Sequence, residues 1–191
     1  YQKKGSVGLP IIGEQVKIKD PDENGEGEIC VKGPNVMLGY YKDPEATAAA
    51  FDEEGYFMTG DYGKLDEDGW LYITGRLKNL IILSNGKNVY PEEIENEISG
   101  IYGVSEVVVY EGESKSQKDK GVIVAEIFPD FEALKLKGIE DPQSYFESEI
   151  KKVNSRMVPY KAVKMVKIRN EEFTKNNSKK ILRFTINKSI D

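Results

Sequence analysis

The sequence predicts an α+β protein with two domains, and three observations lead to this prediction. Before Arg76 the chain consists mainly of short alternating segments separated by turn residues, the pattern expected of β-strands. After Arg76 it combines apolar segments typical of strands with apolar stripes at helical spacing. With 191 residues, 39% of them hydrophobic, the chain is long enough for two globular domains that each bury a core.

The first elements are expected to be two strands, at residues 15–19 and 27–33, because both segments alternate polar and apolar residues. The acidic segment 20–25 lies between them. Its oxygen-bearing side chains are spaced like the start of a calcium-binding loop, but Val31 occupies the twelfth position, where such loops need a glutamate. We therefore interpret this segment as a hairpin turn.

A short helix and a second hairpin follow. Asp43 and Pro44 are favoured at the first positions of a helix, which is expected to continue through Phe51 and to end near Gly55. Segments 63–65 and 70–74 are then joined by an Asp-Gly turn. The acids of that turn could also be metal ligands or an acid/base pair, but hairpin chemistry is the favoured interpretation.

The second half of the chain is expected to mix helices and strands. An Asn85-Gly86 turn separates the first two elements, and the polar segment 112–120 links two strands of one sheet, at 104–110 and 122–128. The expected elements are a strand at 80–83, a helix at 92–98 opened by Pro91, strands at 104–110 and 122–128, a helix at 141–153 and a last strand at 162–168.

Composition excludes several classes of function. The sequence contains no histidine, which removes Ser-His and Cys-His nucleophiles and histidine-ligated metals. Cys30 is the single cysteine and is expected in the core; with no signal segment at the start, a reducing cytoplasm is indicated. The net charge of -6 argues against nucleic-acid binding. No apolar run could span a membrane, although peripheral membrane contact is compatible with the composition.

Two charged residues are the first candidates for a binding site. Asp61 and Arg76 each follow a glycine at a predicted turn, where a polar side chain can point into a cleft. Such a pair suits a ligand with paired hydroxyls. The alternative interpretation is a surface ion pair. The tail 175–183 holds four basic residues and, taken alone, is typical of a solvated surface.

Several motifs, read together, resemble the acyl-adenylate-forming (AMP-binding) superfamily of acyl-CoA synthetases, peptide-synthetase adenylation domains and luciferases. They occur in family-like order and cover essentially the whole chain. The insert at 128–144 and the Thr-Lys-Asn-Asn-Ser-Lys-Lys-Ile tail are most similar to long-chain fatty acyl-CoA ligases. The motifs are Gly-Tyr-Tyr at 39–41, Asp-Pro-Glu-Ala-Thr at 43–47, Tyr-Phe-Met-Thr-Gly-Asp at 56–61, Gly75-Arg76, Gly86 and Glu-Glu-Ile-Glu at 92–95.

The resemblance implies that residues 1–77 are the β-rich end of a large N-terminal domain and that residues 78–191 form a small α+β lid. The chain begins with Tyr1 and not methionine, so we expect it to be part of a longer protein. In such proteins the phosphate loop, the adenine-binding strand and the glutamate that helps to hold Mg²⁺ would precede this chain. No metal ligand is assigned here, and the chain alone is expected to be inactive.

The resemblance also implies roles for individual residues. Asp61 would accept both ribose hydroxyls of ATP, and Arg76 would lie near the ribose and phosphate. Lys78 falls on the hinge, Gly86 on the turn that lets the pantetheine arm of CoA pass, and Lys180 on the lysine that reaches the substrate carboxylate and α-phosphate during adenylation.

The assignment of Lys180 departs from the family pattern at one position. The common tail has glycine before this lysine, whereas here the preceding residue is Lys179. The spacing to Ile181 and Arg183 favours Lys180, and Lys179 is the alternative.

The expected function is therefore that of the C-terminal part of an ATP-dependent, AMP-forming fatty acyl-CoA synthetase. Its substrates would be a fatty acid, ATP and CoA. One alternative is a ligase that passes its acyl-adenylate to a carrier protein. Another is a non-enzymatic interaction module. Five residues match the family's functional positions and argue against this alternative, because random mutation in a non-enzymatic protein would have little reason to keep all of them. They are Asp61, Arg76, Lys78, Gly86 and Lys180.

Overall fold

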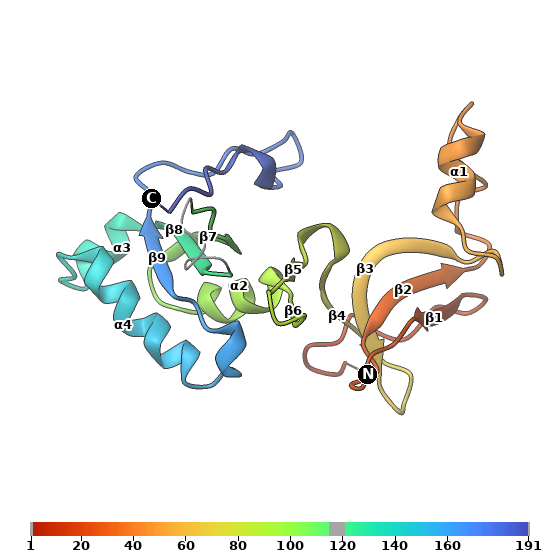
Figure 1. Ribbon diagram of the computed structural model, residues 1–191, viewed down its shortest axis with the longest axis horizontal. Coiled ribbons are helices and arrows are strands. Elements are labelled where there is room, and N and C mark those ends of the chain that lie inside the picture. Colours follow the sequence, from red (N-terminus) through yellow and green to blue (C-terminus); the bar gives the residue numbers. More distant parts are fainter. Residues whose placement is uncertain (1, 115–120, 191) are drawn as a thin grey trace. The chain divides into compact units, whose positions relative to one another are not determined.

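The computed structural model describes residues 2–114 and 121–190, and the chain divides into two compact units, Tyr1–Lys78 and Asn79–Asp191. Both units combine helices with strands (Figure 1), and most strand pairs are antiparallel, which confirms the α+β class. The assignment of the units to a large domain and a lid stays a prediction. No helix in the described part of the chain combines the length and apolar character that crossing a membrane requires.

The first unit is built on one antiparallel sheet with the strand order β1-β2-β3-β4. Its strands are β1 (Gln15–Lys19), β2 (Gly27–Lys32), β3 (Phe57–Leu65) and β4 (Leu71–Arg76). Buried side chains of its core include Ile29, Cys30 and Tyr62, so the expected burial of the cysteine is confirmed.

Both acidic segments of the first unit are hairpin turns, as predicted. Asp22 Oδ1 accepts hydrogen bonds from the backbone N–H groups of Asn24 (2.8 Å) and Glu26 (3.0 Å). Asp66 Oδ1 accepts from those of Asp68 (3.0 Å) and Trp70 (2.9 Å). These aspartates satisfy the turn backbone. Within residues 2–114 and 121–190, no group of three or more metal-ligating side chains is placed to hold a metal ion.

Helix α1 (Pro44–Ala50) begins as predicted but is shorter. The Asp43 side chain accepts a hydrogen bond from Ala46 N at 2.9 Å, which caps the helix. The prediction that it continues through Phe51 to near Gly55 is wrong, because Phe51 is extended and pairs with Phe57 at the start of β3. Their ring centroids lie 5.7 Å apart.

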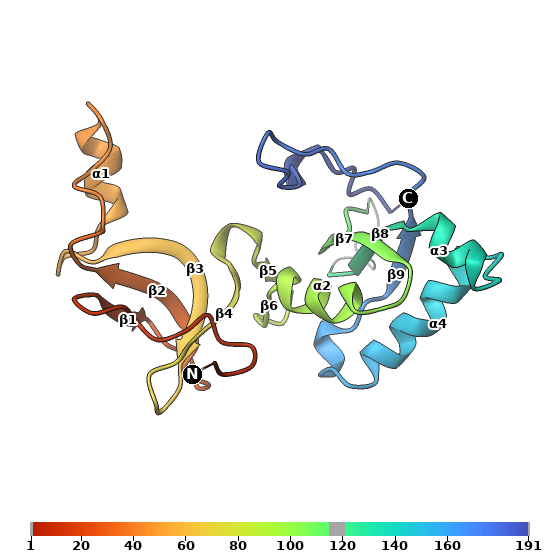
Figure 2. The same cartoon turned by 180° about the vertical axis from the view of Figure 1, so that it is seen from behind.

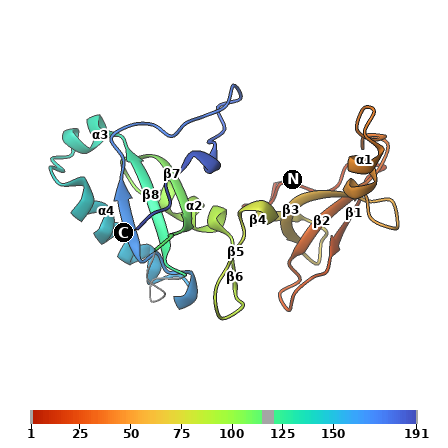
Figure 3. The same ribbon diagram turned by 45° about the horizontal axis from the view of Figure 1, so that its top comes forward.

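The short helix η1 (Leu77–Asn79) spans the boundary between the two units. The second unit begins at Asn79 and continues with a small hairpin of β5 (Ile81–Ile82) and β6 (Asn88–Val89). Figure 3 shows this hairpin directly before α2 (Pro91–Ser99). The strand predicted at 80–83 is thus only two residues long, whereas the predicted turn and the helix opened by Pro91 are confirmed.

The main sheet of the second unit has the order β7-β8-β9. Strands β7 (Val104–Glu111) and β8 (Ile123–Pro129) are antiparallel, and β9 (Met165–Ile168) runs parallel to β8. A parallel pair needs a crossover, here formed by α3 (Phe131–Leu136), α4 (Pro142–Asn154) and η3 (Pro159–Lys161). Most of the predicted polar linker, residues 115–120, lies outside the described residues.

Helices cover one face of this sheet (Figure 2). The apolar stripe predicted for the helix at 141–153 is confirmed by Phe146, Ile150 and Val153, all buried on α4. Helix α3 was not predicted; Asp130 caps it through Ala133 N at 2.9 Å. The core on this face includes Ile94, Ile98, Val109, Ile123, Ala125, Ile127, Leu134, Phe146, Ile150 and Val163.

The C-terminal segment after β9 covers the opposite face of the sheet. Successive strand residues point to opposite faces, so Val108, Tyr110 and Val124 lie on this second face. Phe173 is buried against them with a 3% exposed surface. The tail side chains of Ile181, Ile186 and Ile190 pack there as well. The segment therefore belongs to the core of the unit, although it contains little regular structure besides η4 (Arg183–Thr185).

Candidate functional site

Asp61 and Arg76 face each other across two neighbouring strands of the first unit. They are register partners on β3 and β4, and Arg76 Nε lies 2.7 Å from Asp61 Oδ1. The side chains are 23% and 53% exposed, respectively, so the two residues form the partly exposed ion pair of the alternative interpretation, and their role in nucleotide binding stays a prediction. The sequence placed both residues at turns, which is wrong: β3 continues through Gly60, whose φ of +69° bends the strand without ending it.

The backbone at Asp61 is held by two residues that sequence reasoning did not single out. Thr59 Oγ1 accepts a hydrogen bond from Asp61 N at 3.0 Å and donates one to Ile29 O at 2.7 Å. Glu28 Oε1 accepts one from Gly60 N at 3.2 Å. The threonine of the Thr-Gly-Asp sequence was the available signal, because a threonine hydroxyl often bonds the backbone N–H of the residue two positions later.

Lys78 is the last residue of the first unit and is exposed within η1. The next residue, Asn79, donates a side-chain hydrogen bond from Nδ2 to Glu92 Oε1 on α2. This contact fixes the start of the second unit to its first helix.

Gly86 lies in the turn between β5 and β6. Its φ is +77°, its N–H donates to Leu83 O at 2.8 Å, and Asn85 Oδ1 accepts from Lys87 N at 3.1 Å. A Cβ atom added at Gly86 would meet no heavy atom within 4 Å. The backbone therefore favours glycine, while the space beside it within this unit is open.

Lys180 is exposed and lies in a compact turn of the tail. Asn176 Oδ1 accepts hydrogen bonds from Ser178 N at 3.0 Å and Lys180 N at 2.9 Å. Asn176 N donates to Lys180 O at 2.9 Å, and Lys175 pairs with Ile181 as an isolated bridge. Asn176 thus holds the turn together. The only indication of this role in the sequence was that asparagine is a residue favoured in turns.

The residue before Lys180 has an unusual backbone. Lys179 adopts φ +60°, in the left-handed region that glycine enters without steric cost. The resemblance places glycine at the position directly before the reactive lysine. The backbone of Lys179 therefore matches that glycine, which favours Lys180 over Lys179 as the counterpart of the reactive lysine.

Comparisons with known proteins agree with these motifs. Residues 1–41 match the family described as AMP-binding enzyme. A long-chain-fatty-acid–CoA ligase of Salmonella typhimurium is 40% identical over 185 residues, which cover 94% of this chain and 30% of that protein. The chain belongs to the AMP-binding enzyme family. A second family relative, human long-chain-fatty-acid–CoA ligase 1, is 41% identical over 136 residues, which cover 68% of this chain and 19% of that protein.

Solved structures of AMP-binding enzymes share this fold. The o-succinylbenzoate CoA synthetase (MenE) of Bacillus subtilis in complex with its acyl-adenylate intermediate has a TM-score of 0.77 at 32% identity, covering 95% of this chain and 35% of that chain. ATP-bound MatB of Rhodopseudomonas palustris has a TM-score of 0.75 at 31% identity, covering 94% of this chain and 34% of that chain. The chain thus spans about a third of the length of these enzymes.

Replacing Lys179 by glycine is expected to stabilise this member of the AMP-binding family by about 0.5–1 kcal/mol, because relief of the left-handed strain outweighs the added freedom of the unfolded chain. Thermal unfolding would measure the gain. Lys164→Gly is a matched control, because Lys164 is exposed and is not among the residues with positive φ. This control should lose stability, and an equal loss for Lys179→Gly would contradict the expectation.

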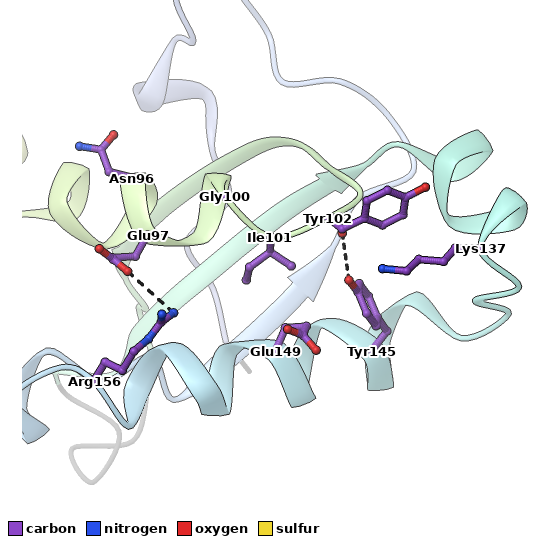
Figure 4. Close-up of a pocket in the computed structure, with 9 residues that line it drawn as sticks. All are labelled: Asn96, Glu97, Gly100, Ile101, Tyr102, Lys137, Tyr145, Glu149 and Arg156. Carbon is purple, nitrogen blue, oxygen red and sulfur yellow. Dashed lines mark hydrogen bonds and ion pairs between the residues drawn. The ribbon is translucent and has the colours of Figure 1, made fainter. Parts of the chain in front are cut away.

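An open groove of about 540 Å³ lies elsewhere on the second unit (Figure 4). Arg156 reaches Glu97 at 3.9 Å, the Tyr145 hydroxyl donates to Tyr102 O at 3.1 Å, and Lys137 lies 4.2 Å from the centre of the Tyr102 ring. None of the site residues predicted for this AMP-binding chain lines the groove. Because these side chains contact one another, we assign no function to it.

Proposed function

We propose that this chain is the C-terminal part of an ATP-dependent, AMP-forming fatty acyl-CoA ligase. In the first half-reaction a fatty acid carboxylate oxygen attacks the α-phosphorus of ATP, and pyrophosphate leaves. In the second, the thiol of CoA loses its proton and attacks the acyl carbon, and AMP leaves. The observation that carries the proposal is the 40% identity to a long-chain-fatty-acid–CoA ligase, which extends over 94% of this chain and includes Asp61 and Arg76 as register partners on facing strands.

Asp61 and Arg76 suit the nucleotide that the proposal requires. A carboxylate has two acceptor oxygens, and Arg76 contacts one of them, Oδ1. In the proposal, Asp61 accepts the ribose hydroxyls, and the partly exposed guanidinium of Arg76 lies near the ribose and phosphate. We place the Mg²⁺ ligands in the part of the protein outside this chain.

The remaining residues divide between the two half-reactions. Lys180 offsets the charge that builds on the α-phosphate during adenylation. Lys78 is the pivot at which a few backbone dihedrals change between the half-reactions. Gly86 borders the path of the pantetheine arm in the second half-reaction. We also propose a reducing, cytoplasmic location, which the free thiol of buried Cys30 supports.

Replacing Gly86 by asparagine in the full-length enzyme is expected to slow thioester formation at least about tenfold, because a side chain in the path of the thiol misplaces it. Asparagine tolerates the left-handed backbone, so folding should change little. Acyl-adenylate formation should also be unchanged. Single-turnover measurements of each half-reaction would test this.

A matched control for that substitution is Gly25→Asn, because Gly25 has φ +74° and also no heavy atom near an added Cβ. The control should leave both half-reactions intact. Unchanged thioester formation in Gly86→Asn would contradict the proposed passage.

The decisive test of the proposed function is an assay of the full-length enzyme with ATP and fatty acids of graded length, offering CoA and a carrier protein as competing acceptors. We expect acyl-AMP to form and CoA to be the preferred acceptor. Preference for the carrier protein would identify an acyl-AMP ligase, and absence of any acyl-AMP would favour an interaction module. The present chain alone should show no exchange between ATP and pyrophosphate, and detectable exchange would contradict its proposed incompleteness.

A further inference from the structure

Arg183 lies in a half-buried polar cluster of the second unit. Its Nη2 lies 2.6 Å from Glu95 Oε2 and 3.6 Å from Glu92 Oε1, both on α2. Its Nη1 donates to Val109 O on β7 at 3.2 Å. The guanidinium therefore joins the tail, α2 and β7 by directed contacts.

Glu95 is built into the same cluster and is 14% exposed. Its Oε1 accepts the backbone N–H of Val109 at 2.6 Å, while Oε2 faces Arg183. Burial raises the pKa of Glu95, although Arg183 acts in the opposite direction. Removing the cation from a mostly buried carboxylate costs free energy, so breaking the Glu95–Arg183 ion pair is unfavourable.

A second carboxylate holds the other end of the same tail segment. Glu106 on β7 contacts Lys175 Nζ, and its Oε2 accepts the backbone N–H of Phe173 at 3.0 Å. Phe173 is also buried on the second face of the sheet. The turn that carries Lys180 is therefore fixed at both ends, by Glu106 before it and by Glu95 after it.

We propose that Arg183, held by Glu95, positions Lys180 for acyl-adenylate formation. The proposal rests on the proposed function above. Only two residues separate Lys180 from Arg183, so release of Arg183 would let the turn move and carry Lys180 away from its working position. Small displacements of a group that stabilises developing charge have large effects on rate. Arg183 acts through Lys180 and is a positioning residue.

The first test replaces Arg183 by methionine in the full-length enzyme. We expect kcat of acyl-adenylate formation to fall about 10- to 100-fold while KM for ATP changes less than about threefold. Thioester formation from supplied acyl-adenylate should stay nearly intact, which also shows that the variant is folded. Arg183→Lys keeps the charge but loses the fork of donors and should restore part of the rate.

Arg156→Met is the matched control, because Arg156 has a distant, exposed partner in Glu97 at 3.9 Å. It should leave both half-reactions unchanged. A wild-type rate of adenylation in Arg183→Met, or an equal loss in both half-reactions, would overturn the positioning role.

A double variant separates positioning from general stabilisation. If Arg183 acts through Lys180, then adding Arg183→Met to Lys180→Ala should cause no further loss of adenylation. Losses that multiply would overturn the proposal. The two proposals fail in different ways: a wild-type enzyme that forms no acyl-AMP with any fatty acid removes the proposed function as well, whereas an active wild type with multiplying losses removes only the positioning role.

Discussion

Replacing Lys180 by alanine in the full-length enzyme is expected to slow acyl-adenylate formation about 100- to 1,000-fold, the effect of removing one preorganised group that stabilises developing charge. The reason is that the exposed ammonium sits on a turn held by Asn176 and is not used in an ion pair of the described residues. Single-turnover conversion of ATP and fatty acid to acyl-AMP would measure the loss. Thioester formation from supplied acyl-adenylate should remain nearly intact.

Lys179→Ala is the matched control for that experiment, since it removes the neighbouring ammonium from the same turn. Its adenylation rate should stay close to that of the wild type. If Lys179→Ala shows the large loss and Lys180→Ala does not, the reactive lysine is the other member of the pair. Equal loss in both half-reactions of Lys180→Ala would contradict a role confined to adenylation.

Replacing Phe146 by alanine is expected to destabilise the second unit by about 3–5 kcal/mol, the usual cost of emptying a core site of this size. Phe146 is fully buried on α4, within the core that α2 and α4 share with the sheet. Its ring also lies 5.0 Å from that of Tyr145, a contact that the substitution removes.

Denaturant unfolding of the present chain would measure this effect with two probes. Most helical residues lie in the second unit, so circular dichroism should show a shifted transition. The single tryptophan, Trp70, lies in the first unit, and its fluorescence transition should not shift. Phe184→Ala is the matched control, because Phe184 is 83% exposed and should cost less than about 0.5 kcal/mol. Equal shifts for the two phenylalanines would contradict the expected core role.

Elements defined by local chemistry could be predicted from the sequence. Asp22 and Asp66 made their hairpin turns predictable, and Asp43 made the start of its helix predictable. The side chain of each aspartate accepts a hydrogen bond from a backbone N–H group within four residues. The helix α3 was missed because six residues are too few to establish a periodic pattern. The strand β3 is longer than predicted, because glycine at position 60 is typical of a turn and led to the prediction that the strand begins only after it.

Features that depend on distant residues could not be predicted. Asp61 lies opposite Arg76 because the register of the β3–β4 hairpin shifts between Tyr62 and Gly63, and the local sequence pattern does not specify such an irregularity. The packing of the tail was missed because Ile181, Ile186 and Ile190 follow neither a helical nor a strand period. The resemblance proposed Lys180 as the reactive lysine, which stays a prediction, but it could not indicate the left-handed backbone of Lys179, which only the fold reveals.

The tail that carries Lys180 also shields the second face of the β7-β8-β9 sheet, where Val108, Val124 and Phe173 are buried. Cutting the chain before Phe173 would therefore do more than remove Lys180, the lysine that we propose acts in adenylation. It would leave a contiguous apolar surface in contact with water, and such surfaces promote aggregation. Truncated forms are therefore expected to be poorly soluble, which would prevent a measurement of the proposed effect of losing Lys180. Point substitutions, which keep the shield, are the appropriate way to study this segment.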